Sequence, residues 1–395
     1  MAAVWLILVG ADGSMAQTPP IYQFGEIVVT ADGPRVVEEV TTVDVVTAEE
    51  IDRAGARTLD EALELLPGLQ LRRGAEGIVL LDVRGLRARN VLLLLDGVPI
   101  NASLDGLFDP TTLPLTAVAR IELTRGASSV LYGPTGNAGV VDVVTRAAPP
   151  SNDAALLVEG GDPASTRVAG RASWRRGDLG LVVSGTFFET DGFDLSDDFE
   201  STALEDGGER LASDREDRSI LLGLTSTPED GTRWGVTLGY RGGERGKPPA
   251  TEDFRTSIFA PRTRFERVDA DTLSLHAGLS TELGRGLTLR PTAFVNRTES
   301  LTDGFDDATF SSQVAAGAFR QDATASTSGA GLQLAWRRPA GSLFTLGVDV
   351  RRERWRAEGF ELVASDGGNG GGGNGGGGTG GGGTGGGGNG GGGNG

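Results

Sequence analysis

The sequence has no cysteine and a single histidine, His276. The missing thiols exclude disulfides, iron–sulfur clusters and thiolate zinc sites, and one imidazole leaves little room for a histidine metal site or a Ser-His-Asp triad. Positive charge is also scarce, because 36 Lys and Arg residues stand against 54 Asp and Glu residues. The net charge of −18 argues against nucleic-acid binding as the main task.

Two further classes are disfavoured by what the chain does not contain. No nucleophile–base set and no metal-ligand constellation is recognisable, so we expect neither an enzyme nor a resident cofactor or metal. No run of 18 or more apolar residues occurs, so no membrane-spanning helix is expected after the N-terminus. A transmembrane β-barrel stays open, because its strands alternate and never look hydrophobic as a whole.

The composition changes along the chain and suggests a domain layout. Residues 1–16 hold a short apolar stretch and then Ser14-Met15-Ala16, which resembles a cleavage site, so we interpret them as a partial signal peptide that lacks its positive start. The alternative is an arbitrary apolar start. Residues 17–34 are a flexible segment, 35–148 a compact α/β domain, 151–360 a β-rich region, and 367–395 a low-complexity tail of 23 Gly, four Asn and two Thr.

Two helix starts are marked within residues 35–148. Thr47-Ala48-Glu49-Glu50 and Thr58-Leu59-Asp60-Glu61 both have the capping-box pattern, in which the threonine hydroxyl and the glutamate carboxylate satisfy exposed backbone N–H groups. Gly55 is placed to end the first helix and Pro67-Gly68 the second. Extended runs are predicted at 69–72, 78–84, 91–95, 120–124 and 140–145. Residues 91–95 are apolar on both faces, which predicts a central strand that turns through Asp96-Gly97.

Three ordered motifs in this domain identify a family. VRGLRARNVLLLLDGVPI (Val83 to Ile100), VARIELTRGASSVLYG (Val118 to Gly133) and GNAGVVDVVTR (Gly136 to Arg146) resemble the plug domain of TonB-dependent outer-membrane receptors. The resemblance covers residues 25–148. It implies the bacterial cell outer membrane, outer-membrane lipid around a barrel, and import of a small metal chelate or vitamin, such as a ferric siderophore or cobalamin.

The resemblance also implies roles for particular residues. A hydrophobic patch before the plug resembles the TonB box, which binds a TonB-type energy-coupling protein; it consists of Glu26, Ile27, Val28, Val29, Thr30 and Ala31. Plug charges of the family pair with barrel acids, and the matching residues are Arg84, Glu122 and Arg125; the alternative is that these residues are satisfied within the plug. By loop position alone, the candidates for ligand contact are Arg72, Arg73, Asn101 and Asp105.

The β-rich region has its own physical signature. Over residues 234–240 the even positions are apolar or aromatic and the odd positions are Gly or Thr, and this span is ~20 Å long with aromatic residues at both ends, as expected of a lipid-facing strand. Arg167, Arg171 and Arg175 share the second face of another strand, which suits a wet lumen better than the dry core of a soluble β-sandwich, the alternative fold. His276 is expected to be a residue of the lumen wall.

Nine strands are predicted, at about 154–160, 165–175, 179–190, 217–226, 233–243, 266–281, 286–300, 322–338 and 342–357. Tight turns alternate with the long segments 191–216, 244–265 and 301–321, which is the pattern of outer-membrane barrels. The insert from Glu189 to Arg218 carries 12 acids and three Arg, as expected of a solvated loop; a Ca²⁺ or lipopolysaccharide-bridging role is the alternative.

The fold class that follows is an α+β plug followed by an incomplete antiparallel transmembrane β-barrel of about nine strands. Plugged transporters have 22 strands, so the chain is expected to be the N-terminal part of a receptor. As given, it should form an open sheet that does not transport. A plug-bearing signalling or interaction protein is the alternative function.

Overall fold

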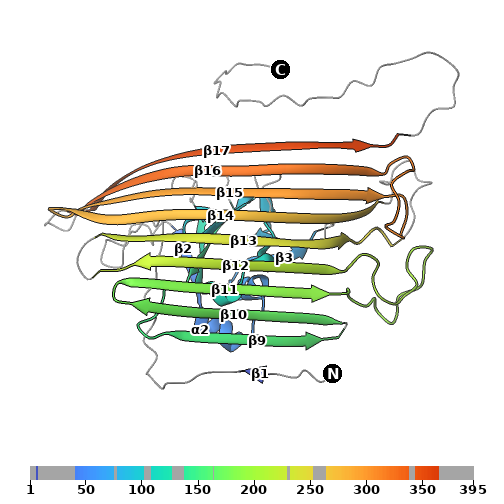
Figure 1. Cartoon of the computed structure of the whole chain (residues 1–395), viewed down its shortest axis with the longest axis horizontal. Coiled ribbons are helices and arrows are strands. Elements are labelled where there is room, and N and C mark those ends of the chain that lie inside the picture. The colour runs from blue at the N-terminus through green and yellow to red at the C-terminus, as the bar shows by residue number, and fades with distance from the viewer. Residues whose placement is uncertain are drawn as a thin grey trace, which may run out of the picture.

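The computed structural model describes residues 6–7, 41–74, 78–101, 108–126, 138–162, 164–228, 232–251, 264–337 and 343–363. They form a long curved antiparallel sheet with a smaller α/β unit behind it (Figure 1). We call the α/β unit the plug and the curved sheet the barrel sheet. Among these residues, no helix is long and apolar enough to cross a membrane.

The barrel sheet contains all nine predicted strands, each paired with its neighbours in sequence. The strands are β9 (Asp153–Gly161), β10 (Ser165–Arg176), β11 (Leu179–Thr190), β12 (Arg215–Ser226), β13 (Arg233–Lys247), β14 (Phe265–Gly284), β15 (Leu287–Phe305), β16 (Phe319–Arg337) and β17 (Leu343–Glu361). The two-residue β1 (Leu6–Ile7) pairs with β9 at one edge, and β17 forms the other edge, so the described sheet is not closed. The expected fold class is confirmed, and the assignment of residues 1–16 as a signal peptide stays a prediction.

The two faces of the barrel sheet differ as the alternation predicted. Leu238 and Leu273 are 39% and 55% exposed on the convex face, whereas Thr237 and His276 on the concave face are 3% and 1% exposed. Trp174, Trp234 and Trp336 all lie within two residues of the strand ends that carry the short turns. Aromatic residues at one level of an outward apolar band form the girdle of a membrane barrel. The concave face is covered by the plug, a separate mixed α/β unit with its own core, so the fold is not the soluble β-sandwich that was the alternative.

The plug is built around a five-stranded sheet of order β2-β7-β8-β5-β6, with a separate β3–β4 hairpin. Its elements are β2 (Thr41–Thr47), α2 (Ala48–Ala54), α3 (Leu59–Leu63), β3 (Leu69–Arg73), β4 (Val79–Val83), η1 (Ala88–Asn90), β5 (Val91–Leu95), β6 (Val98–Pro99), η2 (Pro110–Thr112), η3 (Leu115–Ala117), β7 (Val118–Gly126) and β8 (Gly139–Thr145). As predicted, β5 lies inside the sheet and is buried along its whole length. Asp96 and Gly97 form the turn to β6 with φ angles of 51° and 78°.

The first predicted capping box is present and the second is not. The Thr47 hydroxyl accepts a hydrogen bond from the Glu50 N–H at 3.3 Å, the Thr47 N–H donates to the Glu50 carboxylate at 2.8 Å, and Gly55 ends the helix with φ 73°. Thr58 makes no side-chain cap, because the Glu61 carboxylate instead accepts from the N–H of Arg57 at 2.7 Å. Helix α3 is therefore little more than one turn long.

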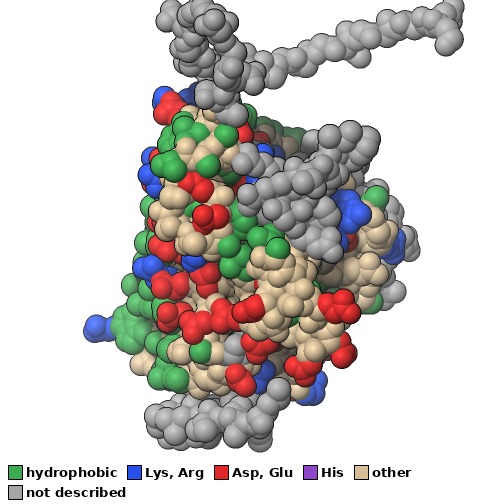
Figure 2. All heavy atoms as spheres, turned by 90° about the vertical axis from the view of Figure 1, so that its right-hand side faces the viewer, with side chains coloured by type: hydrophobic (Ala, Val, Ile, Leu, Met, Phe, Trp, Pro, Cys, Tyr) green, Lys and Arg blue, Asp and Glu red, His purple; other side chains and the backbone are tan. Residues whose placement is uncertain are grey.

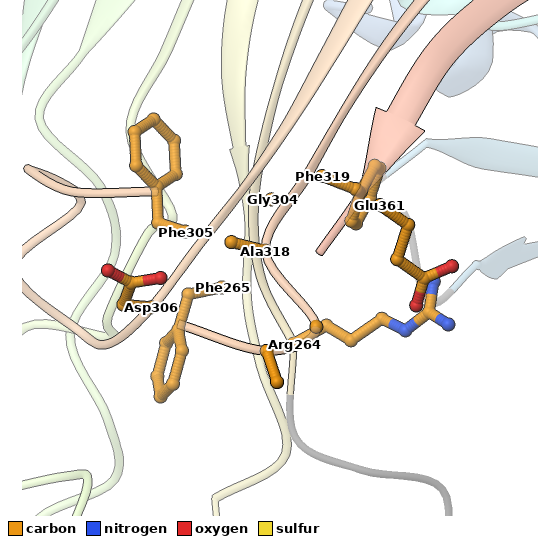
Figure 3. Close-up of a pocket in the computed structure, with 10 residues that line it drawn as sticks. Arg264, Phe265, Gly304, Phe305, Asp306, Ala318, Phe319 and Glu361 are labelled. Atoms are coloured by element: carbon orange, nitrogen blue, oxygen red, sulfur yellow. The ribbon is translucent and has the colours of Figure 1, made fainter. Parts of the chain in front are cut away.

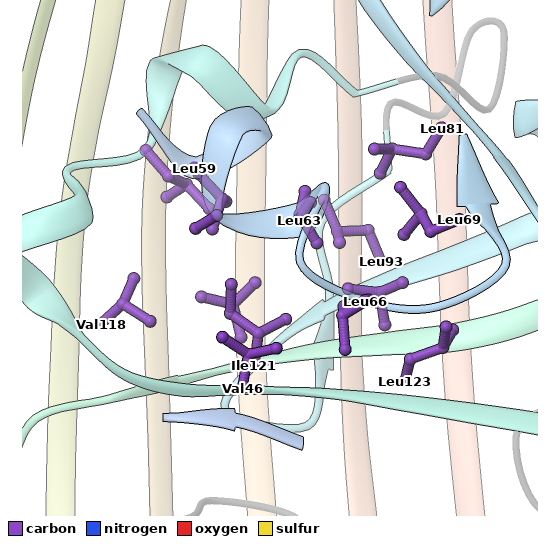
Figure 4. Packing of buried hydrophobic residues seen from close by; sticks show 14 of the residues in the cluster. Val46, Leu59, Leu63, Leu66, Leu69, Leu81, Leu93, Val118, Ile121 and Leu123 are labelled. Carbon is purple, nitrogen blue, oxygen red and sulfur yellow. The ribbon is translucent and has the colours of Figure 1, made fainter. Parts of the chain in front are cut away.

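One hydrophobic cluster holds the plug together (Figure 4). Leu59 and Leu63 of α3 pack with Ile121 and Leu123 of β7, and all four side chains are fully buried. A single described barrel residue, Leu221 of β12, joins this cluster. Burying each of these side chains contributes about 2 kcal/mol, so nearly all of the apolar stabilisation of the plug comes from its own residues.

We therefore expect residues 25–150, expressed alone, to fold as a unit. Thermal unfolding followed by circular dichroism should be a single cooperative transition, with a dispersed NMR spectrum. Leu221 is absent from this fragment, so its melting temperature should lie below that of the plug in the whole chain. A broad melt without chemical-shift dispersion would contradict the prediction.

Candidate functional site

The plug and the barrel sheet meet through a buried ion pair that the sequence did not suggest. Arg215, at the start of β12, lies 2.9 Å from the Asp109 carboxylate of the plug and 2.5 Å from the hydroxyl of Thr111. Its guanidinium also bonds Asp217 on the same strand. The side chains of Arg215 and Asp109 are only 14% and 8% exposed. This contact anchors the segment before η2 to the barrel wall.

A second anchor lies on the neighbouring strand. The Arg241 guanidinium of β13 stacks over the ring of Phe108 at 4.6 Å and lies 3.4 Å from the Thr112 hydroxyl. Within the described part of the chain it contacts no carboxylate closely enough to form an ion pair. Arg241 is thus a half-buried cation held to the plug mainly by an aromatic face.

A third anchor joins the β5–β6 hairpin to β14 and β15. The Asn296 amide donates to the Pro99 carbonyl at 3.0 Å, and its carbonyl oxygen lies 2.9 Å from His276 Nε2. Because the Asn296 oxygen can only accept, Nε2 carries the proton of this histidine. His276 is 1% exposed and lies edge-on to Phe294. It is therefore a residue of the lumen wall, as expected.

The end of the plug is fixed near the short turns. Arg175 of β10 donates to the Ala148 carbonyl at 2.7 and 3.0 Å and to the Thr227 hydroxyl at 2.9 Å. The Thr116 hydroxyl donates to the Gly170 carbonyl at 3.2 Å. The concave face thus supplies polar side chains along the height of the plug.

Beside the first anchor, a cavity of about 580 Å³ lies between the plug and the long-loop ends of β10 to β13, and Arg215 and Thr111 are part of its lining. A smaller one of about 190 Å³ adjoins it and shares Thr112, Asp217 and Arg245 in its lining. Polar side chains such as Thr58, Asp60, Glu61 and Arg167 alternate with apolar surface around the larger space. We call the two cavities together the chamber. Its volume is that of a small-molecule site, and its groups can bind a polar ligand but offer no nucleophile–base pair.

The chamber opens toward an acidic surface. Figure 2 views the end that carries the long loops, where carboxylate side chains gather. Much of this charge comes from the loop between β11 and β12, which is ordered by the Asp194–Glu209 bridge and by an ion pair of Arg210 with the buried Glu205. The expected acidic insert is therefore a folded loop.

A separate pocket of about 220 Å³ lies at the loop ends of β14 to β17. Figure 3 shows the rings of Phe265, Phe305 and Phe319 around it. Its neighbouring loop folds on Asp306, whose carboxylate accepts from the Ser312 hydroxyl and from the N–H groups of Val314 and Ala315 at 2.7 to 3.0 Å. These bonds, first that of Ser312, hold the pKa of Asp306 below its usual value. The pocket results from loop packing and lies apart from the plug.

Two of the three predicted plug–barrel charges, Glu122 and Arg125, form ion pairs inside the plug. Glu122 pairs with Arg120 on the same strand, and Arg125 pairs with Asp44 of β2 while donating to the Pro67 carbonyl at 3.0 Å. Arg84 is exposed and has a φ of 50°. The contact of Arg84, Glu122 and Arg125 with barrel acids therefore stays a prediction.

The other predicted site residues are only partly described. Arg72 pairs with Asp82 at 3.2 Å, and Asn101 lines the chamber while its side chain bridges Leu93 N–H and the Val91 carbonyl at 2.7 and 3.2 Å. The TonB box, the Arg73 side chain and Asp105 lie outside the described residues. The sequence prediction did not name Arg215 or Arg241. The alternation of side chains along β12 and β13 places both on the lumen face of the sheet.

Among the described residues, no group of three or more carboxylates or imidazoles is placed to hold a metal ion. The nearest candidates in the chamber are already engaged, since Asp109 and Asp217 both bond Arg215. The expected absence of a resident metal stays an expectation.

Comparison with known proteins finds a family model that matches the plug. Residues 35–140 match the family model of the TonB-dependent Receptor Plug Domain. The vitamin B12 transporter BtuB of Photobacterium profundum is 34% identical over 142 residues, which are 36% of this chain and 23% of that protein. BtuB of Vibrio cholerae is 38% identical over 107 residues, or 27% and 18% of the two chains.

Solved structures share the fold of this chain over the barrel sheet as well as the plug. The unliganded ferric citrate transporter FecA superposes with a TM-score of 0.64 at 18% identity, over 82% of this chain and 49% of that one. The copper transporter OprC gives 0.62 at 17% identity, over 80% and 47%. The chain thus spans about half the length of these structures and under a quarter of the two BtuB proteins. Its residues 35–140 are therefore similar to the plug domain of the TonB-dependent receptors, and its described strands share the fold of these solved transporters. The TonB-dependent receptors are a family of the bacterial outer membrane made up of transporters and receptors.

Proposed function

We propose that this chain is part of an outer-membrane receptor that imports a scarce ligand, such as a ferric siderophore or cobalamin, with energy from a TonB-type protein. The observation that carries the proposal is the position of the plug. It packs on the concave polar face of strands whose convex face is apolar, and it leaves the chamber on the long-loop side. Such an arrangement blocks the lumen and presents a binding site outward.

The anchors suggest how the plug is held and what the ligand meets. Arg215, Arg241 and Asn296 bind the plug between Pro99 and Thr112, and the same segment lines the chamber. A ligand in the chamber would contact the anchored segment and the barrel wall together. The related proteins are named for vitamin B12, ferric citrate and copper, so similarity alone does not choose the ligand.

Uptake in the host bacterium tests the proposal. A strain deleted for this gene should lose accumulation of one ligand from a panel of radiolabelled cobalamin, ferric citrate and ferric catecholate chelates, and should grow poorly when that ligand is limiting. Restoring the gene should restore uptake only while the TonB-type protein is present. Unchanged uptake of every probe and normal growth under iron and cobalamin depletion would reject the proposal.

A further inference from the structure

Two carboxylates hold the turn of the β5–β6 hairpin against the end of β8. The Asp96 side chain accepts from the N–H and from the hydroxyl of Thr145, each at 2.8 Å, and the Asp96 N–H donates to the Val143 carbonyl at 3.0 Å. Asp142 accepts from the N–H of Gly97 at 3.1 Å. Each residue of the turn is thus bonded to β8, and Asp96 is 0% exposed.

The charges around this turn do not balance. Glu122 of β7 lies directly opposite Asp142 in the sheet, so three carboxylates gather near one cation, Arg120, whose ion pair is with Glu122. Strands β5 and β6 supply no titratable side chain, and β8 supplies only Asp142. Arg146, just beyond β8, lies near Asp52, Asp153 and Arg171 instead. Within the described residues, Asp96 and Asp142 therefore have no cation of their own.

Burial without a cation favours the neutral acid. Desolvation raises the pKa of Asp96 to about 6, against the hydrogen bonds of Thr145. Desolvation, and then the charges of Asp96 and Glu122, raise the pKa of Asp142 to about 7. Both values lie above the unfolded value of 3.8. The stability from these groups is therefore complete below pH 3.8 and is lost as the pH rises through 6 to 7.

We propose that Asp96 and Asp142 together form a proton-dependent clasp: while the two buried side chains are protonated, the β5–β6 hairpin stays on β8, and loss of their protons loosens the hairpin. The hairpin reaches the barrel wall through the bond from Asn296 to Pro99 and continues to Asn101 in the chamber. Opening the clasp would therefore weaken the contact between the plug and the wall. This regulation is independent of which ligand the receptor imports.

Hydrogen exchange of the Gly97 and Thr145 amides tests the clasp directly, because these N–H groups bond the two carboxylates. The whole chain in detergent micelles is followed from about pH 5 to about pH 8, with rates corrected for intrinsic base catalysis. We expect the opening equilibrium of both amides to rise at least ~10-fold across this range, since one pKa unit corresponds to a tenfold change. The Asp142 side chain is partly exposed, so we expect a smaller change in the opening equilibrium than a fully buried carboxyl group would give.

Matched variants locate the effect. Asp142→Asn can still accept from Gly97, and Asp96→Asn can still bond Thr145 and tolerates the positive φ; each should flatten the pH dependence without unfolding the plug. Glu64→Gln, which removes an exposed carboxylate elsewhere in the plug, should leave it unchanged. Infrared spectra at neutral pH should show a protonated carboxyl band that Asp142→Asn removes. A flat profile in the unmodified chain, or a profile that survives in the Asp96→Asn, Asp142→Asn double variant, would overturn the clasp.

Discussion

Replacing Val28 by proline should abolish energy-dependent uptake while leaving ligand binding intact. Val28 lies in the middle of the proposed TonB box, an apolar β-rich patch between Pro19-Pro20 and Gly33-Pro34. Such a segment can bind a partner by adding a strand to its sheet, in which backbone N–H groups supply the affinity. Proline has no N–H and a fixed φ, so it breaks that pairing. We expect accumulation of the ligand to fall to the level of a strain without the TonB-type protein.

A control variant distinguishes the loss of backbone pairing from the loss of the valine side chain. Val28→Thr keeps the backbone donor and a β-branched side chain, so it should retain most uptake. Surface binding of the radiolabelled ligand at low temperature should be equal in both variants, because residue 28 is not among the residues that line the chamber. Normal uptake by Val28→Pro would show that residues 26–31 are not the coupling segment.

The strands were predictable because their signal is local. Several barrel strands, such as β13, alternate within their own sequence, and tight turns mark the ends of others, so that the observed ends of β11 match the predicted 179–190. The structure extends β14 to β17 toward the long loops, where Phe265 and Phe305 belong to strands rather than loops. In the plug, Thr47 and Gly55 bracket α2 because both capping signals lie within one short segment.

Contacts between distant segments were not predictable in the same way. Arg125 matches the family motif, yet its partner Asp44 lies on an adjacent strand of the plug, far away in sequence. Asp109 and Arg215 are 106 positions apart, and Arg215 lies two residues before the predicted strand 217–226, within the predicted acidic insert. The alternation places Arg215 on the lumen face, but only the three-dimensional arrangement brings a plug carboxylate to it.

The buried pair of Arg215 and Asp109 should therefore have the largest effect of any plug–wall contact. In Arg215→Gln, two carboxylates, Asp109 and Asp217, lose their cation in a site where the Asp109 side chain is 8% exposed. Removing one partner of a buried pair costs about 3–5 kcal/mol, because the other charge stays desolvated. Exchange of the amides around η2 should rise by a factor of ~100 or more, corresponding to that cost.

The neighbouring pair on β12 provides the control. Arg218 and Glu216 form an ion pair at 2.6 Å with side chains 55% and 35% exposed, so Arg218→Gln should cost no more than ~1 kcal/mol. Asp109→Asn keeps the acceptor for the Thr111 N–H and should cost less than Arg215→Gln, since Arg215 retains Asp217. The double variant should be no worse than Arg215→Gln alone, because the stranded Asp109 charge is then gone. If the free-energy costs of Arg215→Gln and Asp109→Asn simply add in the double variant, the two residues act separately. Another contact would then anchor the segment before η2.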